Sequence, residues 1–143
     1  MLLILYYTVL NTELELKKEN TDPCKTSFLD LSIEIVGNKI STKLFDKRDS
    51  FPFYINRMPY IDSNIPSKIF YASIGSEILR IARTTTHVHN IVTRVNELLN
   101  RMNKQGSRKE NISSLIKKLF GRHFAVFKKF ASTANEFINL FTF

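Results

Sequence analysis

The chain has 143 residues, of which 43% are hydrophobic and 24% are charged, a composition typical of a globular domain rather than a disordered one. This length suits one domain with its own core. Its single cysteine, Cys24, excludes an internal disulfide framework and a zinc site built from several cysteines. A single cysteine is also typical of a reducing compartment, so we expect an intracellular protein, cytoplasmic or nuclear.

The charge is unevenly distributed along the chain. Residues 1–66 contain eight Lys or Arg against nine Asp or Glu, whereas residues 67–143 contain thirteen against four. The net charge of +8 therefore belongs to the C-terminal half. A strongly basic half favours a polyanionic partner, and nucleic acid is a better candidate than an anionic membrane surface. A basic surface that only keeps the protein soluble would have the same composition.

The N-terminal segment predicts no membrane anchor. Residues 2–10 are apolar, but nine residues are too few to cross a bilayer, and no basic stretch precedes them. We therefore expect no transmembrane segment or signal peptide. The apolar periodicity of residues 2–10 fits a helix or a strand equally well. Residues 12–16 alternate as a half-buried strand does, and the polar residues 17–26 predict a loop.

A β-hairpin over residues 28–46 is the clearest local pattern. Apolar side chains alternate with polar ones from Leu29 to Ile35, which predicts a strand with one apolar face. Gly37-Asn38 is a two-residue turn signal, and Ile40, Thr42 and Leu44 then share one face of the returning strand. Residues 51–55 predict a further short strand, at a sheet edge because of Pro52.

Helical periodicity takes over after Pro59 and Pro66. Apolar residues recur with helical spacing over residues 67–83 and 86–104, and Gly106 stands where a C-cap glycine is expected. A third helix begins at Ser107, whose spacing to Glu110 is that of a capping box. Gly121 kinks or ends this helix, and the Phe-rich residues beyond it predict a continuation or a fourth helix.

These elements predict an α+β fold: an N-terminal β-hairpin with short accessory strands, followed by a three- to four-helix bundle. The expected division is a β region over residues 1–66 and a basic helical region over residues 67–143.

No group of residues has the spacing of a convincing catalytic or metal-binding motif, and we expect no cofactor in this chain. Asp46 and Asp49 flank Lys47 and Arg48, which makes them better charge partners than metal ligands. Ser107 and His123 lack an acidic residue with the spacing of a triad. His87 and His89 fall on different faces of a helix, so they do not form a joint metal site.

The basic residues of the helical half follow a pattern. Arg80 and Arg83 share a helical face, and further cations recur along the third helix and its continuation, at Lys117, Lys118, Arg122, Lys128 and Lys129. Opposite an apolar stripe, these cations would suit binding to a phosphate backbone. Contacts with phosphates position a duplex without reading its sequence. An ordinary solvated helix face has the same pattern.

The order of sequence blocks resembles the C-terminal part of reverse transcriptase-like proteins of eukaryotic retroelements, broadly Penelope-like. The resemblance runs over about four-fifths of the chain, through the blocks ELELKKE, SFLDLSIEI, GNKISTKLFDKRDSFPFYI, SNIPS, ILRIAR and KKLFGRHFAVFKKF. It implies that the hairpin ends the polymerase palm and that the helices form the thumb, which grips an RNA or DNA duplex. It also implies binding roles for Lys47, Arg48, Arg80, Arg83 and Arg122.

The departures from that family concern activity. No Y-x-D-D motif is present. The divalent metals of phosphoryl transfer would belong to the missing palm. The rest of the polymerase is therefore a candidate partner of this chain. We therefore expect non-specific nucleic-acid binding without polymerase activity. The alternative functions are a helical protein-interaction module, in which the Phe-rich segment packs on a partner, and a peripheral contact with anionic membranes through the third helix.

Overall fold

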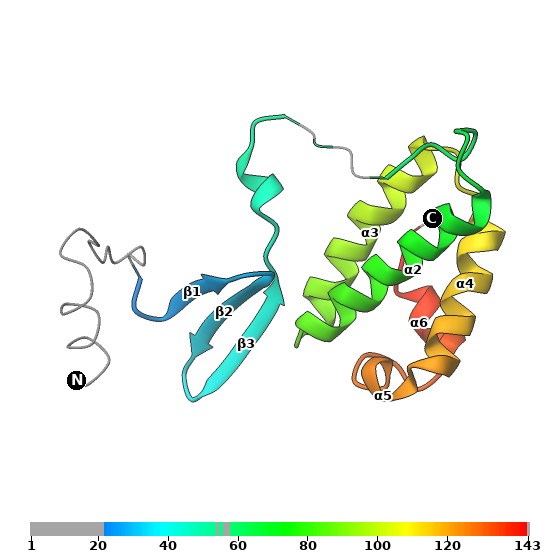
Figure 1. The fold of residues 1–143 in the computed structure, drawn as a ribbon. Helices are drawn as coiled ribbons and strands as arrows, with labels where there is room; N and C mark the ends of the chain where they lie inside the picture. The colour runs from blue at the N-terminus through cyan, green and yellow to red at the C-terminus, as the bar shows by residue number, and fades with distance from the viewer. Residues whose placement is uncertain (1–21, 54, 56–57, 143) are drawn as a thin grey trace, which may run out of the picture.

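The computed structural model describes residues 22–53, 55 and 58–142 and confirms an α+β fold. A three-stranded sheet precedes the helices and projects from their side (Figure 1). The predictions for residues 2–10 and 12–16 lie outside the described residues. The elements are β1 (Lys25–Phe28), β2 (Leu31–Val36), β3 (Lys39–Leu44), the 3-10 turn η1 (Lys47–Ser50), α2 (Ser67–Thr84), α3 (Val88–Lys104), α4 (Lys109–Arg122), α5 (Phe124–Phe127) and α6 (Ala134–Asn139).

The predicted hairpin is present as β2 and β3, which pair antiparallel around a turn at Gly37. Gly37 has a φ of 60°, a value that glycine adopts without strain. The register places Ile33 opposite Thr42 and Ile35 opposite Ile40, which confirms the predicted apolar face for these residues.

The start of the hairpin was predicted wrongly. Leu29 does not open a strand; its φ is 53°, and it turns the chain between β1 and β2. Residues 25–26, predicted as part of a loop, instead belong to β1, which pairs antiparallel with β2. The polar sequence Lys-Thr-Ser hides this strand, because its side chains remain exposed and no apolar alternation is required.

The strand predicted at residues 51–55 is also absent from the described part of that segment. The turn η1 precedes this segment and is capped by the Asp46 carboxylate, which accepts a hydrogen bond from the Arg48 backbone N–H. Residues 51–53 then form a bend around Pro52. Proline has no backbone N–H to donate to a neighbouring strand.

The predicted helices over residues 67–83 and 86–104 are confirmed as α2 and α3. The end of α3 is a Schellman motif: Ser107 N–H donates to Met102 O and Gly106 N–H donates to Asn103 O. Gly106 has a φ of 90° and confirms the predicted C-cap glycine. A Cβ at Gly106 would lie 2.5 Å from Ile61 Cγ2, since the preceding loop packs against this helix end.

The predicted capping box at the third helix is wrong. Arg108, not Ser107, is the N-cap of α4, and no side chain caps it. Because Ser107 closes the Schellman motif of α3, its backbone is committed to that helix end. Tyr71 of α2 accepts hydrogen bonds from the Arg108 N–H and from Asn111 Nδ2 instead, at 3.3 and 3.0 Å.

The core lies almost entirely between the helices. Gly75 of α2 permits a close approach to α4, where a Cβ would meet Leu115 Cδ1 at 3.3 Å. Within the described residues, Leu44 is the strand residue that joins this core. The buried hydrophobic side chains are Leu44, Phe70, Ile74, Ile78, Ile81, Ala82, Ile91, Val95, Leu98, Leu99, Met102, Ile112, Ile116, Phe120, Phe127, Phe130, Phe137 and Phe141.

The Phe-rich C-terminus forms two short helices rather than one continuous helix. After α4 ends at Arg122, one residue beyond Gly121, the chain makes α5, turns, and restarts at a capping box between Thr133 and Glu136. Phe137 is fully buried, and its ring centroid lies 4.9 Å from those of Phe127 and Phe141. The break lets the aromatic rings converge on one point of the bundle.

Candidate nucleic-acid interface

An ion-pair network joins the end of the sheet to α3. The Asp46 carboxylate accepts hydrogen bonds from Arg48 Nε at 2.8 and 2.9 Å, and Arg94 Nη2 donates to it at 2.9 Å. Arg94 also pairs with Asp49 at 3.0 Å and with Glu97 at 2.8 Å. The predicted pairing with the flanking cations is confirmed for Asp46, which binds Arg48, whereas Asp49 pairs with the distant Arg94 instead.

The guanidinium of Arg48 holds the pKa of Asp46 well below its usual range, with a smaller contribution from Arg94. Asp46 is therefore ionised at neutral pH, as a charge partner requires. Arg94 is the partner that the sequence analysis missed. It is 45 residues from Asp49, and only the fold brings the two together.

A second ion pair holds α2 against the sheet. Arg80 binds Glu77 at 2.8 Å within α2 and Asp30 at 2.8 Å in the turn between β1 and β2. Both carboxylates raise the pKa of Arg80, and the hydrogen bonds that it donates to Glu77 are the larger cause. Arg80 and Arg48 are thus both occupied by carboxylates. Arg80 ties the turn between β1 and β2 to α2, whereas Arg48 pairs locally with Asp46 at η1.

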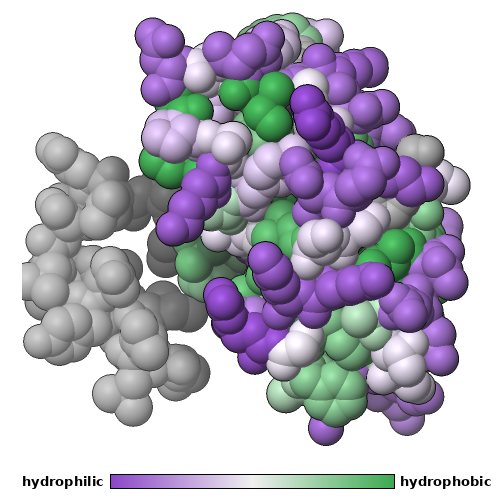
Figure 2. Space-filling model, turned by 90° about the vertical axis from the view of Figure 1, so that its right-hand side faces the viewer, coloured by the Kyte–Doolittle hydropathy of each residue, from purple (hydrophilic) through white to green (hydrophobic). Residues whose placement is uncertain are grey.

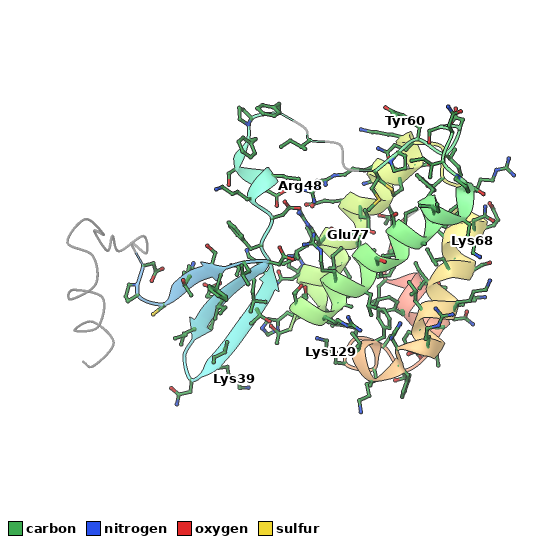
Figure 3. The ribbon with its side chains drawn as sticks, in the orientation of Figure 1. Lys39, Arg48, Tyr60, Lys68, Glu77 and Lys129 are labelled. Carbon is green, nitrogen blue, oxygen red and sulfur yellow. The ribbon has the colours of Figure 1, made fainter. Side chains whose placement is uncertain are left out.

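Lys129 is occupied as well. Its ammonium donates to the Thr85 carbonyl at 2.7 Å and lies 4.8 Å from the centre of the Phe130 ring. Burial lowers its pKa. Figure 3 shows Lys129 beside the end of the helical bundle near α5, and Arg48 and Glu77 where the sheet meets the helices. Lys129 therefore fastens α5 to the loop between α2 and α3.

The side chains of the other predicted binding residues are exposed and form no hydrogen bond or ion pair with the described part of the chain. They are Lys47, Arg83, Lys117, Lys118, Arg122 and Lys128. Lys118 and Arg122 are four residues apart on α4 and share its outer face. The buried face of this helix carries Ile112, Ile116 and Phe120. The space-filling view of this side of the molecule is largely hydrophilic (Figure 2).

Three of the four acidic residues of the helical half are engaged in other contacts. Glu77 and Glu97 are paired with arginines near the sheet, and Glu136 accepts hydrogen bonds from the backbone N–H groups of Ser132 and Thr133. Glu110 is on α4 itself, in its first turn. Positive charge at the far end of α4 and on α5 is therefore not neutralised by a carboxylate in the described part of the chain. This surface, Lys117, Lys118, Arg122 and Lys128, is called the α4–α5 basic face below.

The described residues do not pair Ser107 with His123 and do not assemble a metal site. Ser107 Oγ is buried without a hydrogen-bond partner there, so it is not paired with His123. No group of three or more His, Cys, Asp and Glu side chains within this part of the chain is arranged to hold a metal ion. Cys24 is exposed with a free thiol.

Comparison with known proteins gives no relative from which to transfer a function. No protein-family model, curated protein or solved structure matches this chain. Across residues 22–53, 55 and 58–142, no helix combines the length and the apolar character needed to cross a membrane.

Proposed function

We propose that the chain binds nucleic-acid duplexes through the α4–α5 basic face, as a thumb-like part of a reverse transcriptase-like protein of a retroelement. The proposal depends on one observation: the side chains of these cations are exposed and unpaired in the described structure, while Glu77, Glu97 and Glu136 are used in other contacts. Lysine and arginine side chains on a phosphate backbone release counterions, which supplies affinity that does not depend on sequence.

The resemblance in the order of sequence blocks supports the retroelement origin, and the succession of a hairpin and basic helices agrees with a palm end followed by a thumb. Lys47 on η1 and Arg83 near the end of α2 are exposed but lie outside this face, so their binding roles stay predictions from the sequence. We assign Arg48, Arg80 and Lys129 to holding the fold together, because carboxylates or a backbone carbonyl occupy them. No polymerase activity is proposed for the chain.

Titration of a fluorescently labelled RNA–DNA hybrid, followed by fluorescence anisotropy, tests this proposal. We expect micromolar dissociation constants that rise steeply between about 50 and 200 mM salt, with equal affinity for hybrids of different sequence. Absent binding, or binding that salt does not weaken, contradicts the proposal.

A protein-interaction module is the second candidate, and the sheet favours it. Phe28, Ile35 and Ile40 share one face of the sheet by register and are 68%, 49% and 65% exposed. β1 is also an outer strand in the described sheet order. The sequence predicts that the Phe-rich C-terminus would contact the partner. In the structure Phe127, Phe130, Phe137 and Phe141 are instead buried inside the chain. Sedimentation analysis showing concentration-dependent assembly, without affinity for the hybrid, favours this candidate.

Peripheral membrane binding through α4 is the weakest of the three, since the apolar stripe of α4 is buried in the bundle. Co-sedimentation with anionic liposomes tests it, and we expect the protein to remain in the supernatant.

A further inference from the structure

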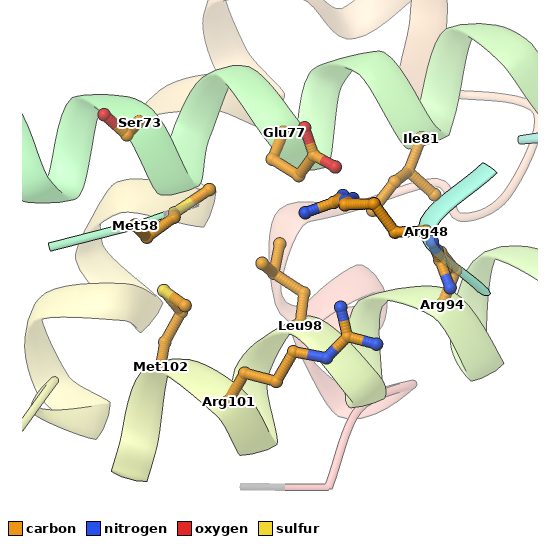
Figure 4. A pocket seen from close by; sticks show the side chains of 9 residues that line it. All are labelled: Arg48, Met58, Ser73, Glu77, Ile81, Arg94, Leu98, Arg101 and Met102. Atoms are coloured by element: carbon orange, nitrogen blue, oxygen red, sulfur yellow. The ribbon is translucent and has the colours of Figure 1, made fainter. Parts of the chain in front are cut away.

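Polar contacts attach the sheet to the helical bundle at more than one point. Two of them are ion pairs, Arg80–Asp30 and Arg94–Asp46. Figure 4 shows Arg94 with Arg48 between α2 and α3, on the wall of a pocket of about 180 Å³. A further attachment consists of threonine hydroxyl and backbone groups, where β3 meets the segment between α2 and α3. This attachment differs from the ion pairs because a threonine hydroxyl accepts covalent modification.

The threonine attachment joins Thr42 of β3 to Thr86. The Thr42 N–H donates to Thr86 Oγ1 at 2.6 Å, and Thr86 Oγ1 donates to the Thr42 carbonyl oxygen at 2.9 Å. The Thr86 N–H donates to the same carbonyl oxygen at 3.0 Å. One hydroxyl group therefore both accepts and donates at the point where an outer strand of the sheet meets the bundle.

Thr86 is the last of three consecutive threonines, and it is the exposed one. Thr84 Oγ1 donates to the carbonyl oxygens of Arg80 and Ile81 within α2, and Thr85 is only 1% exposed. Thr86 lies after the helix, next to extended backbone at Thr85. A kinase has to bring the acceptor oxygen in line with the γ-phosphorus of its nucleotide. The fold therefore favours Thr86 over its two neighbours as a phosphate acceptor.

Positive charge is available beside Thr86 to hold a phosphate. The side chain of Arg83, three residues earlier, is exposed and forms no ion pair with the described part of the chain. The Lys129 ammonium donates to the Thr85 carbonyl oxygen at 2.7 Å. The N-terminus of α3 follows directly, without a side-chain cap and without an acidic residue in its first turn, and a helix N-terminus attracts negative charge. Carboxylates in the adjoining groove, by contrast, are paired with Arg94.

We propose that Thr86 is a phosphorylation site that controls how firmly the sheet is held on the bundle. Thr86 Oγ1 attacks the γ-phosphorus of a nucleoside triphosphate, the bond to the departing nucleoside diphosphate breaks, and the hydroxyl proton passes to the catalytic base of a serine/threonine kinase. Arg83, at the third position before the acceptor, suits a kinase that recognises basic residues through an acidic substrate groove. The inference does not rest on duplex binding, since Thr86 lies outside the α4–α5 basic face.

Phosphorylation would exchange one set of contacts for another. A phosphothreonine side chain carries about −1.5 to −2 charges at pH 7, and its oxygens repel the carbonyl oxygen of Thr42 instead of donating to it. The same charge is attracted to the N–H groups at the start of α3. The segment would therefore turn from β3 towards α3, while the ion pairs of Arg80 and Arg94 remain. The modified sheet is loosened at one edge, not detached.

Hydrogen exchange of the full chain, with phosphothreonine introduced at residue 86 during synthesis, tests the switch without any kinase. The Thr42 N–H is the reporter, because its acceptor is Thr86 Oγ1. We expect this amide to exchange about tenfold faster or more in the phosphorylated chain, while amides in the first turn of α3 exchange more slowly. Thr86→Val is the matched control: it also loses the hydroxyl group but brings no charge, so the first turn of α3 should gain no protection. Unchanged exchange at Thr42, or the same exchange pattern in both proteins, would overturn the proposal.

Phosphorylation of the full chain by a basophilic serine/threonine kinase with ATP, mapped by mass spectrometry, tests the choice of acceptor. We expect Thr86 to react about tenfold faster or more than Thr84 and Thr85, which require local opening of the fold. Arg83→Gln should slow the reaction, whereas Arg122→Gln, an equal change of charge on α4, should leave it unchanged. No phosphate on Thr86, an equal rate at Thr84 or Thr85, or equal effects of the two variants would each contradict the proposal.

Discussion

The helical bundle and the sheet are stabilised by different interactions. Phe70, Ile74, Ile91 and Phe137 are almost completely buried in the bundle, whereas Phe28, Leu29 and Ile40 on the sheet are more than half exposed. Arg80–Asp30, Arg94–Asp46 and the hydrogen bonds between Thr42 and Thr86 attach the sheet to the helices. The bundle has a core of its own, and the sheet depends largely on polar contacts with it.

Substitution of Phe137 by Ala should have the largest effect. Its ring contacts those of Phe120, Phe127, Phe130 and Phe141, so truncation leaves a cavity where α4, α5 and α6 meet. We expect the free energy of unfolding to fall by about 3–5 kcal/mol, measured by urea denaturation. Phe124→Ala is the matched control, because Phe124 is 49% exposed. Equal losses in both variants would contradict the description of the aromatic core.

Substitution of Asp46 by Ala should separate the two regions. It removes the cap of η1 and leaves Arg48 and Arg94 without their shared carboxylate, at a cost of about 3 kcal/mol. Hydrogen exchange should accelerate in β2 and β3 while α2, α3 and α4 stay protected. Uniform acceleration through all five elements would show that the sheet and the bundle unfold as one unit.

Substitution of Gly106 by Ala should cost about 1–3 kcal/mol, because a Cβ there meets Ile61 and the backbone has a positive φ. Gly121→Ala is the control, since Gly121 lies within α4 and its Cβ would meet open space. Thermal melts of both variants test this prediction. A destabilised Gly121→Ala beside an unchanged Gly106→Ala would contradict the packing of the loop at Ile61 on α3.

Acid should weaken the junction more gently than substitution does. The pKa of Asp46 is lower in the folded chain than in the unfolded one, so its stabilisation is complete above about pH 4 and is lost as the pH falls through the folded value. Urea denaturation at pH 7 and at pH 3 should show a smaller loss of stability on acidification for Asp46→Asn than for the unaltered chain. An identical loss in both would assign the acid sensitivity to other carboxylates.

The sequence predicts those parts of this fold that follow from apolar periodicity. Apolar residues recur with helical spacing in α2 and α3 and alternate in β2 and β3. In each case they form one face of the element, so the pattern can be recognised from the local sequence. Lys25–Phe28 and the sharp turn at Leu29 carry no such pattern. Ser107 and Glu110 have capping-box spacing, but Ser107 is already used by the end of α3, which local spacing does not reveal.

For the candidate interface, the sequence identifies the basic residues but not which of them are available. Arg80 and Lys118 look equivalent on their helices, yet Arg80 is occupied by Glu77 and Asp30, and Lys118 is exposed without a partner in the described structure. Asp30 is 50 residues from Arg80, and Arg94 is 48 from Asp46. Contacts at such separations depend on how the sheet docks on the bundle, which no local pattern specifies.

We propose that the α4–α5 basic face binds duplexes and that the sheet does not. Two double variants with the same change in net charge test this proposal: Lys117→Gln with Lys118→Gln on α4, and Lys39→Gln with Lys43→Gln on β3. The measurement is the dependence of the RNA–DNA hybrid dissociation constant on salt, by fluorescence anisotropy. We expect the α4 pair to make the slope of log K against log salt less steep by about 1.5–2, and the β3 pair to leave it nearly unchanged. Equal effects of the two pairs, or a larger effect of the β3 pair, would contradict it.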